Sequence, residues 1–176
     1  AEEALQLQPR SLAALLVLNP SGMHKAAEIS AAIRNCVVPG RLQRLATAPE
    51  ILLDVGHNEL AAEALAAFLQ DSGRSQTSCV LAMLADKSAE AVASAMGHRC
   101  KHWFCADSPG ARGQSGARLA QRIKTALPIA EVSVFGPVGD AMQAALARAD
   151  AAETILVFGS FTTVAAAALW LQKHVQ

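Results

Sequence analysis

The chain alternates between short apolar segments and alanine-rich segments, and this alternation narrows its possible folds more than any other property. Six segments are short, apolar and mostly rich in Val, Ile, Leu or Phe, as buried strands are: 41–46, 50–55, 79–84, 102–106, 131–135 and 154–159. Apolar residues recur at helical spacing in 59–70, 88–97, 115–126, 138–149 and 162–173. The pattern predicts a mostly parallel six-stranded sheet with helices on both faces.

The first two predicted strands are separated by only a few residues, which is too short for a parallel crossover. We therefore expect the first strand to be an antiparallel edge strand. Together these features predict a Rossmann-like α/β domain over residues 37–176. Residues 1–36 do not share the alternation. Two helical patterns there are joined by the turn sequence PSG, and they form either an appendage or the end of a preceding domain.

The charge balance and the cysteines limit the class of protein. The 15 basic and 15 acidic residues cancel, so the composition does not favour nucleic acid or an anionic membrane as a partner. No apolar run is long enough to span a bilayer, and the amino terminus lacks the order of a secretory signal. Cys36, Cys79, Cys100 and Cys105 have no metal-like spacing, so we expect buried free thiols, no metal site and a cytoplasmic location.

Polar residues at the carboxyl ends of strands are candidates for ligand binding, because open α/β sheets bind ligands there. In DVGHN, Asp54 ends the second predicted strand, and its carboxylate suits the hydroxyl groups of a ribose. His57 suits a substrate carboxylate, and Asn58 suits the cap of the next helix while it presents its amide. The alternative is local: Asp54 and Asn58 satisfy turn and cap donors, and His57 packs in the turn.

Three further positions carry groups suited to anions. Arg41 follows the rigid Pro-Gly pair at 39–40, and its guanidinium suits bidentate phosphate recognition. Lys87, in ADKS, would neutralise a carboxylate. In GSFTT, Ser160 or Thr162 would cap the last helix, whose first N–H groups suit a carboxylate. Each also fits a plain structural role, with Arg41 on the surface, Lys87 in a solvated turn and Ser160 as a simple cap.

Several familiar motifs are missing from the 176 residues. There is no G-x-x-x-x-G-K-[ST] phosphate loop and no G-x-S-x-G nucleophile motif. The glycines of PGARGQSG (109–116) match neither phosphate-binding pattern, so we predict a flexible loop before a helix. The sequence therefore indicates half of an active site, with no catalytic residue in this domain alone.

The motifs that remain resemble one family. VVPGRLQRLATAPEILLDVGHN, MLADKS, SPGARGQ and ILVFGSFTTVA are similar, in order and spacing, to the carboxy-terminal domain of folylpolyglutamate synthases. Bacterial enzymes that are also dihydrofolate synthases resemble it best, and all belong to the Mur ligase superfamily. The resemblance covers residues 37–176 and, more weakly, the helices before them, which it identifies as the end of a preceding ATPase domain or linker.

The resemblance implies a ligase reaction. Such enzymes use ATP and Mg²⁺ to convert a carboxylate of dihydropteroate or a folate into an acyl phosphate, which the amine of L-glutamate attacks. It implies nucleotide contacts by Arg41 and Asp54. It implies contacts to glutamate or substrate by four residues: His57, Asn58, Lys87 and Ser160. An amino-terminal ATPase domain of the same monomeric enzyme would supply the phosphate loop and the Mg²⁺ ligands, so this chain alone would be inactive.

The sequence departs from the family at some positions, and other functions stay open. The family usually has different residues at four positions: Gly56, Glu59, Ser88 and Thr162. Arg10 stands where the family commonly has a nucleotide-contacting asparagine, so the resemblance leaves the adenine-side contact from this chain open. The alternatives are a stand-alone nucleotide- or amino-acid-binding module, the carboxy-terminal domain of another Mur-type ligase, and a purely structural domain.

Overall fold

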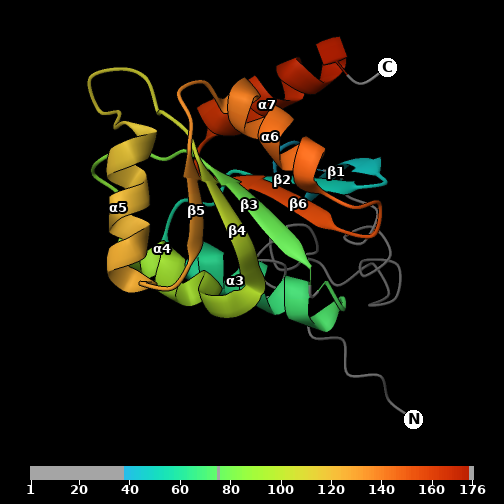
Figure 1. Cartoon of the computed structure of the whole chain (residues 1–176), viewed down its shortest axis with the longest axis horizontal. Coiled ribbons are helices and arrows are strands. Elements are labelled where there is room, and N and C mark those ends of the chain that lie inside the picture. The colour runs from blue at the N-terminus through green and yellow to red at the C-terminus, as the bar shows by residue number, and fades with distance from the viewer. Residues whose placement is uncertain (1–37, 75, 175–176) are drawn as a thin grey trace, which may run out of the picture. The chain divides into compact units, whose positions relative to one another are not determined.

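The computed structural model describes residues 38–74 and 76–174 of the chain. Its strands are β1 (Gln43–Thr47), β2 (Glu50–Asp54), β3 (Thr77–Leu81), β4 (Cys100–Cys105), β5 (Glu131–Val134) and β6 (Thr154–Phe158). Its α-helices are α3 (Glu59–Asp71), α4 (Ala89–Met96), α5 (Gly116–Ala126), α6 (Val138–Arg148) and α7 (Phe161–His174). The elements follow the predicted order (Figure 1). The two helices predicted before residue 36, with Arg10 and Cys36, lie outside the described residues.

The strands form one sheet in the order β1-β2-β6-β3-β4-β5. The edge strand β1 pairs antiparallel with β2, and the other neighbouring strands pair in parallel. The predicted fold class, a mostly parallel sheet with one antiparallel edge strand, is therefore confirmed. The last strand, β6, lies between β2 and β3. After the edge strand β5, the chain therefore returns to the middle of the sheet to form β6.

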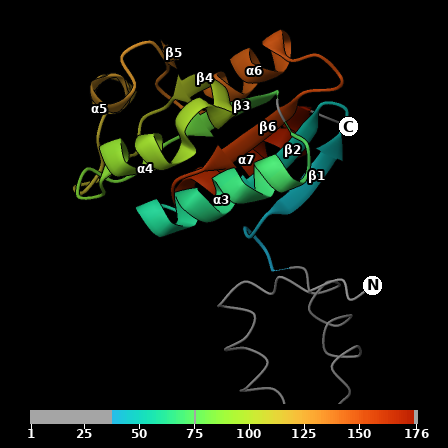
Figure 2. The same ribbon diagram turned by 90° about the horizontal axis from the view of Figure 1, so that it is seen from below.

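Helices cover the two faces of the sheet (Figure 2). They bury a separate apolar cluster on each face. Side chains alternate between the faces along each strand, so neighbouring residues belong to different clusters. One cluster packs against α3, α4 and α5 and includes Leu52, Leu81, Trp103 and Phe158. The other packs against α6 and α7 and includes Leu53, Val80, Phe104 and Val157. This double burial explains why the strands read as continuous apolar runs.

The predicted bounds of the third strand were wrong. The sequence predicted 79–84, but β3 begins at Thr77 and ends at Leu81. Residues 82–84 are apolar too, yet they leave the sheet because side chains from elsewhere take their carbonyl groups. A hydrophobic pattern cannot report such distant partners. The loop that results carries one of the predicted site residues.

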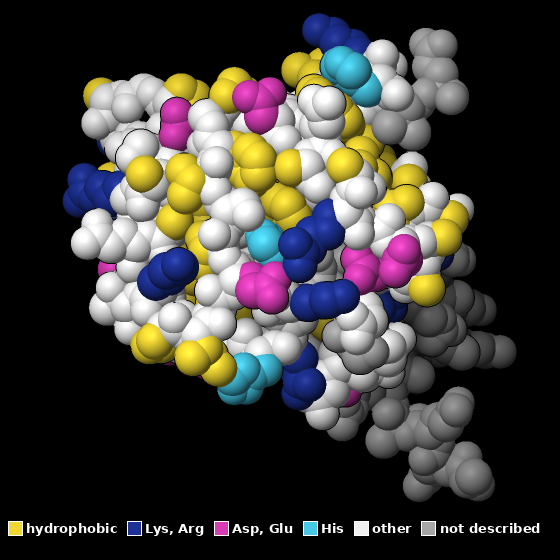
Figure 3. All heavy atoms as spheres, viewed as in Figure 1, with side chains coloured by type: hydrophobic (Ala, Val, Ile, Leu, Met, Phe, Trp, Pro, Cys, Tyr) yellow, Lys and Arg dark blue, Asp and Glu magenta, His cyan; other side chains and the backbone are white. Residues whose placement is uncertain are grey.

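The cysteines within the described residues are buried free thiols, as predicted. Cys79, Cys100 and Cys105 are free and buried, and burial raises the pKa of the Cys105 thiol to about 12. Within residues 38–74 and 76–174, no helix is long and apolar enough to cross a membrane. On the face shown in Figure 3, acidic and basic side chains lie interspersed, without an extended area of one sign.

Candidate functional site

The sheet topology brings three of the predicted junctions to one edge. Asp54 at the end of β2 lies level with Phe158 of β6, and Phe158 lies level with Leu81 of β3. The turns that follow these three strands therefore begin side by side. They contain DVGHN, GSFTT and the loop of residues 82–88. We refer to this part of the molecule as the carboxyl edge.

Asp54 is buried at the carboxyl edge and already accepts several hydrogens. Its Oδ2 accepts from the Leu42 backbone N–H at 3.0 Å, and its Oδ1 accepts from the Gly56 N–H at 2.6 Å. The side chain is only 8% exposed. The carboxylate thus holds the turn before β1 against the turn after β2, which is the local role considered for this residue. Lone pairs that do not face these N–H groups remain available to hydroxyl donors.

Arg41 stands at the rim of the same carboxylate. Its Nη1 lies 3.7 Å from the Asp54 Oδ1, and its side chain is 43% exposed. The turn is tight because Gly40 has a φ of 70°, and a Cβ there would meet the Val55 side chain at 2.8 Å. The rigid turn predicted from the Pro-Gly pair therefore sets a partly exposed guanidinium beside Asp54.

His57 and Asn58 complete the turn after β2. The His57 Nδ1 lies 3.0 Å from the Val55 carbonyl oxygen. Because a carbonyl only accepts, Nδ1 carries a hydrogen, and Nε2 is the ring nitrogen left for a ligand. Asn58 is the N-cap of α3, and its Oδ1 accepts from the Ala61 N–H at 2.9 Å. The predicted cap is confirmed, and the cap uses only the oxygen of the exposed Asn58 side chain, so its amide NH₂ is not needed for it.

Ser160 belongs to a chain of hydroxyl groups at the start of α7. Thr163, which is 2% exposed, donates from its Oγ1 to the Ala82 carbonyl at 2.7 Å. Its single hydrogen is then used, so in the 2.6 Å contact with Ser160 the serine donates. In the 2.8 Å contact with Thr162 the threonine must therefore donate. Ser160 also accepts from the Thr163 N–H at 3.0 Å, which makes Ser160 rather than Thr162 the cap.

The serine turn reaches β3 because Gly159 permits a close approach. Gly159 has a φ of 117°, and a Cβ there would collide with the Ala82 carbonyl oxygen. A side chain would push the start of α7 away from the end of β3.

A hollow of about 320 Å³ lies beside Thr162 and Thr163, between the loops after β4 and β5. The six predicted site residues do not line it.

Lys87 lies in the loop after β3. Its Nζ is 3.5 Å from the Asp86 Oδ2, and its side chain is 30% exposed. The Arg112 Nη2 donates to the same oxygen at 2.7 Å, and this hydrogen bond lowers the pKa of the Asp86 carboxyl. Lys87 is therefore paired only loosely, because Arg112 makes the shorter contact with Asp86.

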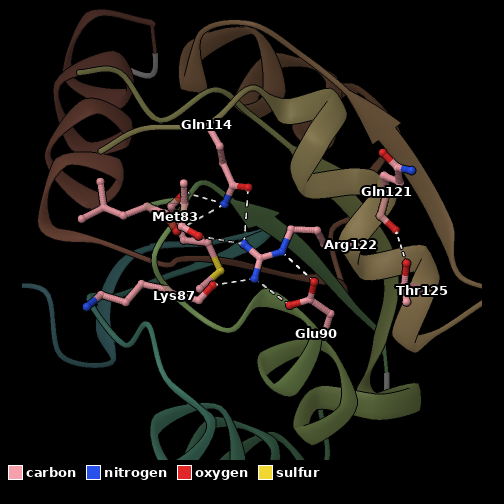
Figure 4. Close-up of polar contacts among 9 residues, drawn as sticks. Met83, Lys87, Glu90, Gln114, Gln121, Arg122 and Thr125 are labelled. Atoms are coloured by element: carbon pink, nitrogen blue, oxygen red, sulfur yellow. Dashed lines mark hydrogen bonds and ion pairs between the residues drawn. The ribbon is translucent and has the colours of Figure 1, made fainter. Parts of the chain in front are cut away.

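The backbone of this loop is held by side chains from other elements (Figure 4). Gln114 is buried, and its Nε2 donates to the Met83 and Leu84 carbonyls at 3.0 and 3.3 Å. The flexible loop predicted for 109–116 is therefore ordered at this end, and Ser108 and Gln114 form a β-bridge. Arg122 of α5 donates to two further carbonyls of the loop. The sequence offered no signal for Gln114 or Arg122, because their partners are far along the chain.

The fold and the carboxyl edge define a class of protein. A family model described as the Mur ligase, glutamate ligase domain, matches residues 40–161, which is more than half of the chain. The chain belongs to this family. The resemblance stated from the motifs is thereby confirmed.

The relatives are folate enzymes. The chain is 33% identical over 162 residues to the dihydrofolate synthase/folylpolyglutamate synthase of Escherichia coli (strain K12). The matched region covers 90% of this chain and 36% of that protein. The structure of E. coli FolC in complex with DHPP and ADP matches with a TM-score of 0.83 and 30% identity over 97% of this chain and 40% of that one. A bifunctional folylpolyglutamate synthase/dihydrofolate synthase with Mn, AMPPNP and L-glutamate bound matches with a TM-score of 0.75 and 31% identity over 92% and 38%. The chain thus spans two fifths or less of these proteins.

Proposed function

We propose that the chain is the carboxy-terminal domain of an ATP-dependent ligase that adds L-glutamate to dihydropteroate or a folate through an acyl phosphate. The observation that carries the proposal is the convergence of the Asp54, Ser160 and Lys87 turns at one edge of a Mur-type sheet. The relatives named above, which are dihydrofolate synthase/folylpolyglutamate synthases and include complexes with ADP and with L-glutamate, support this reaction and these substrates. Residues 37–176 would form this domain, and residues 1–36 the end of the ATPase domain or its linker.

In this proposal Arg41 and Asp54 contact the nucleotide. The exposed Arg41 guanidinium suits a phosphate, because it is charged and offers donors in a planar fork. Asp54 would accept from ribose hydroxyl groups with the lone pairs that do not face Leu42 and Gly56. Both groups are held by the turn at 40–42, so they would meet the nucleotide in a fixed geometry.

Four residues would face glutamate or the acceptor: His57, Asn58, Lys87 and Ser160. Lys87 supplies a positive charge for a carboxylate, and a protonated His57 would donate to one from Nε2. Asn58 keeps two amide hydrogens while its oxygen caps α3. Ser160 donates its one hydrogen to Thr163, so it would donate to a carboxylate only if that contact were exchanged. Exchange of its contact with Thr162 would instead let it accept from the ammonium group of glutamate.

The described residues do not fit a Mg²⁺ site at this edge. Within them, no group of three or more His, Cys, Asp or Glu side chains is placed to hold a metal. Asp54 already accepts from two backbone N–H groups, and Asp86 is paired with Arg112. We therefore assign the metal and the phosphate loop to the amino-terminal ATPase domain of a monomeric cytoplasmic enzyme. Closure of the two domains would exclude water from the acyl phosphate.

The test compares this chain with the full-length protein. Product formation from ATP, L-glutamate and dihydropteroate should occur with the full-length protein and stay at background with residues 1–176 alone. Turnover by the chain alone would contradict the proposal. Calorimetry with ADP and with glutamate separates it from a stand-alone binding module, because half of a site should bind each only feebly. Submillimolar binding by the chain alone would favour the module.

A further inference from the structure

We propose that Arg122 is a positioning residue, which holds the loop of residues 82–88 so that Lys87 presents its ammonium group at the carboxyl edge. The inference rests on the contact proposed above between Lys87 and a substrate carboxylate. It concerns a residue of α5 that belongs to none of the predicted motifs. Its basis is the number and direction of the hydrogen bonds that the Arg122 guanidinium makes.

All five N–H donors of Arg122 have acceptors. Nε and Nη2 form a bidentate pair with the Glu90 carboxylate at 2.7 and 2.6 Å. Nη2 also donates to the Lys87 carbonyl at 2.7 Å. Nη1 donates to the Ala85 carbonyl at 3.2 Å and lies 3.5 Å from the Gln114 Oε1. The guanidinium therefore ties the loop to the first turn of α4 and to α5 at once. A lysine ammonium, with three donors and no planar fork, could replace at most three of these five contacts.

This arrangement leaves little of the loop backbone free. Every carbonyl from Ala82 to Lys87, except that of Asp86, accepts from a side chain of another element. The Ala85 N–H in turn donates to the Arg112 carbonyl at 2.9 Å. Arg122 is only 20% exposed, so its bonds are largely shielded from competing water. The Glu90 carboxyl stays ionised as its partner, because the hydrogen bonds from Arg122 lower its pKa.

Lys87 itself takes part in the network only through its backbone. Its carbonyl accepts from Arg122, while its side chain points away from the guanidinium in Figure 4. The ammonium group has only the loose 3.5 Å pair with Asp86 to exchange for a ligand, although the residue that carries it is held. A positioned charge binds more tightly than a mobile one because less conformational entropy is lost on binding.

The first experiment asks whether Arg122 holds the loop. Hydrogen exchange of the 176-residue chain would be followed at the amides of Ala85, Lys87 and Ala89, which donate within or beside the loop. We expect Arg122→Met to speed exchange at these amides about tenfold or more while β3 and β6 keep their protection. Arg118→Met is the matched control, because Arg118 is an exposed arginine of the same helix. Arg122→Lys keeps the charge and serves if the Met variant does not fold.

The second experiment asks whether the held loop matters for the substrate. In the full-length ligase, Lys87→Met and Arg122→Met should each raise the KM for glutamate roughly ten- to a hundredfold, with the KM for ATP unchanged. The double variant should be no worse than Lys87→Met, because Arg122 would act through Lys87. Arg122→Lys should recover only a small part of the loss, since three donors cannot form the bidentate pair with Glu90 together with both carbonyl bonds.

The outcomes separate the two ideas. Unchanged exchange in the loop of Arg122→Met, or additive effects in the double variant, would overturn the positioning role. A normal glutamate KM in Lys87→Met would instead contradict the contact proposed for Lys87, while the exchange result would still decide whether Arg122 holds the loop.

Discussion

The Asp54 carboxylate has a structural role in the fold and is also a candidate contact to a ribose. It accepts backbone hydrogens from the turns before β1 and after β2, and the Arg41 guanidinium stands at its rim. The sequence allowed either a local role or a ribose contact for this residue. The structure confirms the local role, and the ribose contact stays a prediction. The two roles are compatible, because a carboxylate has about four acceptor sites.

Arg41 offers the simpler test of nucleotide binding. In the full-length ligase, Arg41→Met should raise the KM for ATP about tenfold, because a charge-assisted hydrogen bond to phosphate is lost. The KM for glutamate should not change. Arg44→Met is a suitable control, since Arg44 is a 56%-exposed arginine that pairs with Glu50 near the other end of β2. Equal effects of the two substitutions on ATP would rule out a specific phosphate contact by Arg41.

At the scale of elements, α3 begins where the sequence placed its cap. The Asn58 oxygen accepts from the Ala61 N–H, so Asn58→Ala should lower the free energy of unfolding by about 1 kcal/mol. Chemical denaturation of the 176-residue chain would measure the loss. Asn58→Ser keeps an oxygen at the cap but removes the amide, and it should retain most of the stability. A rise in the glutamate KM in Asn58→Ser, which keeps the cap but lacks the amide, would then report a ligand contact rather than a cap.

Local patterns predicted the elements better than the connections between them. The strand and helix order, the antiparallel edge and the Asn58 cap follow from short-range periodicity, turn length and capping chemistry. These local signals did not predict where β3 ends or that the 109–116 loop is ordered. Both features depend on Gln114 and its partners some 30 residues away. Arg122 was missed for the same reason. An arginine at an ordinary helix position has no local mark of its role.

At the scale of the whole molecule, the edge of the sheet opposite the site is held by a charged cluster. The Glu50 carboxylate pairs with Arg74 and Arg44 and accepts from the Thr154 hydroxyl at 3.1 Å. These contacts join the start of β2, the segment before β3 and the start of β6. Hydrogen bonds from Arg74, above all, lower the pKa of Glu50.

The lowered pKa predicts an acid-sensitive part of the stability. A carboxyl group with a depressed folded pKa stabilises the fold above its unfolded pKa, and this contribution is lost as the pH falls below about 4. Glu50→Gln should cost about 2 kcal/mol at neutral pH, and its stability should fall less than that of the unmodified chain on acidification. Urea unfolding between about pH 7 and pH 3 would measure both. Glu63→Gln, which alters an exposed residue of α3, is the control, and its stability should depend on pH as that of the unmodified chain does.

The central place of β6 also bears on how the domain is made. Both neighbours of β6, the strands β2 and β3, are synthesised long before it, and each then has an edge without its final partner. A nascent chain that has not yet released residues 154–158 from the ribosome therefore exposes two apolar strand edges, which are prone to pair with other chains. Chaperone protection would matter most in that interval, and a premature stop before β6 should yield aggregates rather than a smaller folded domain.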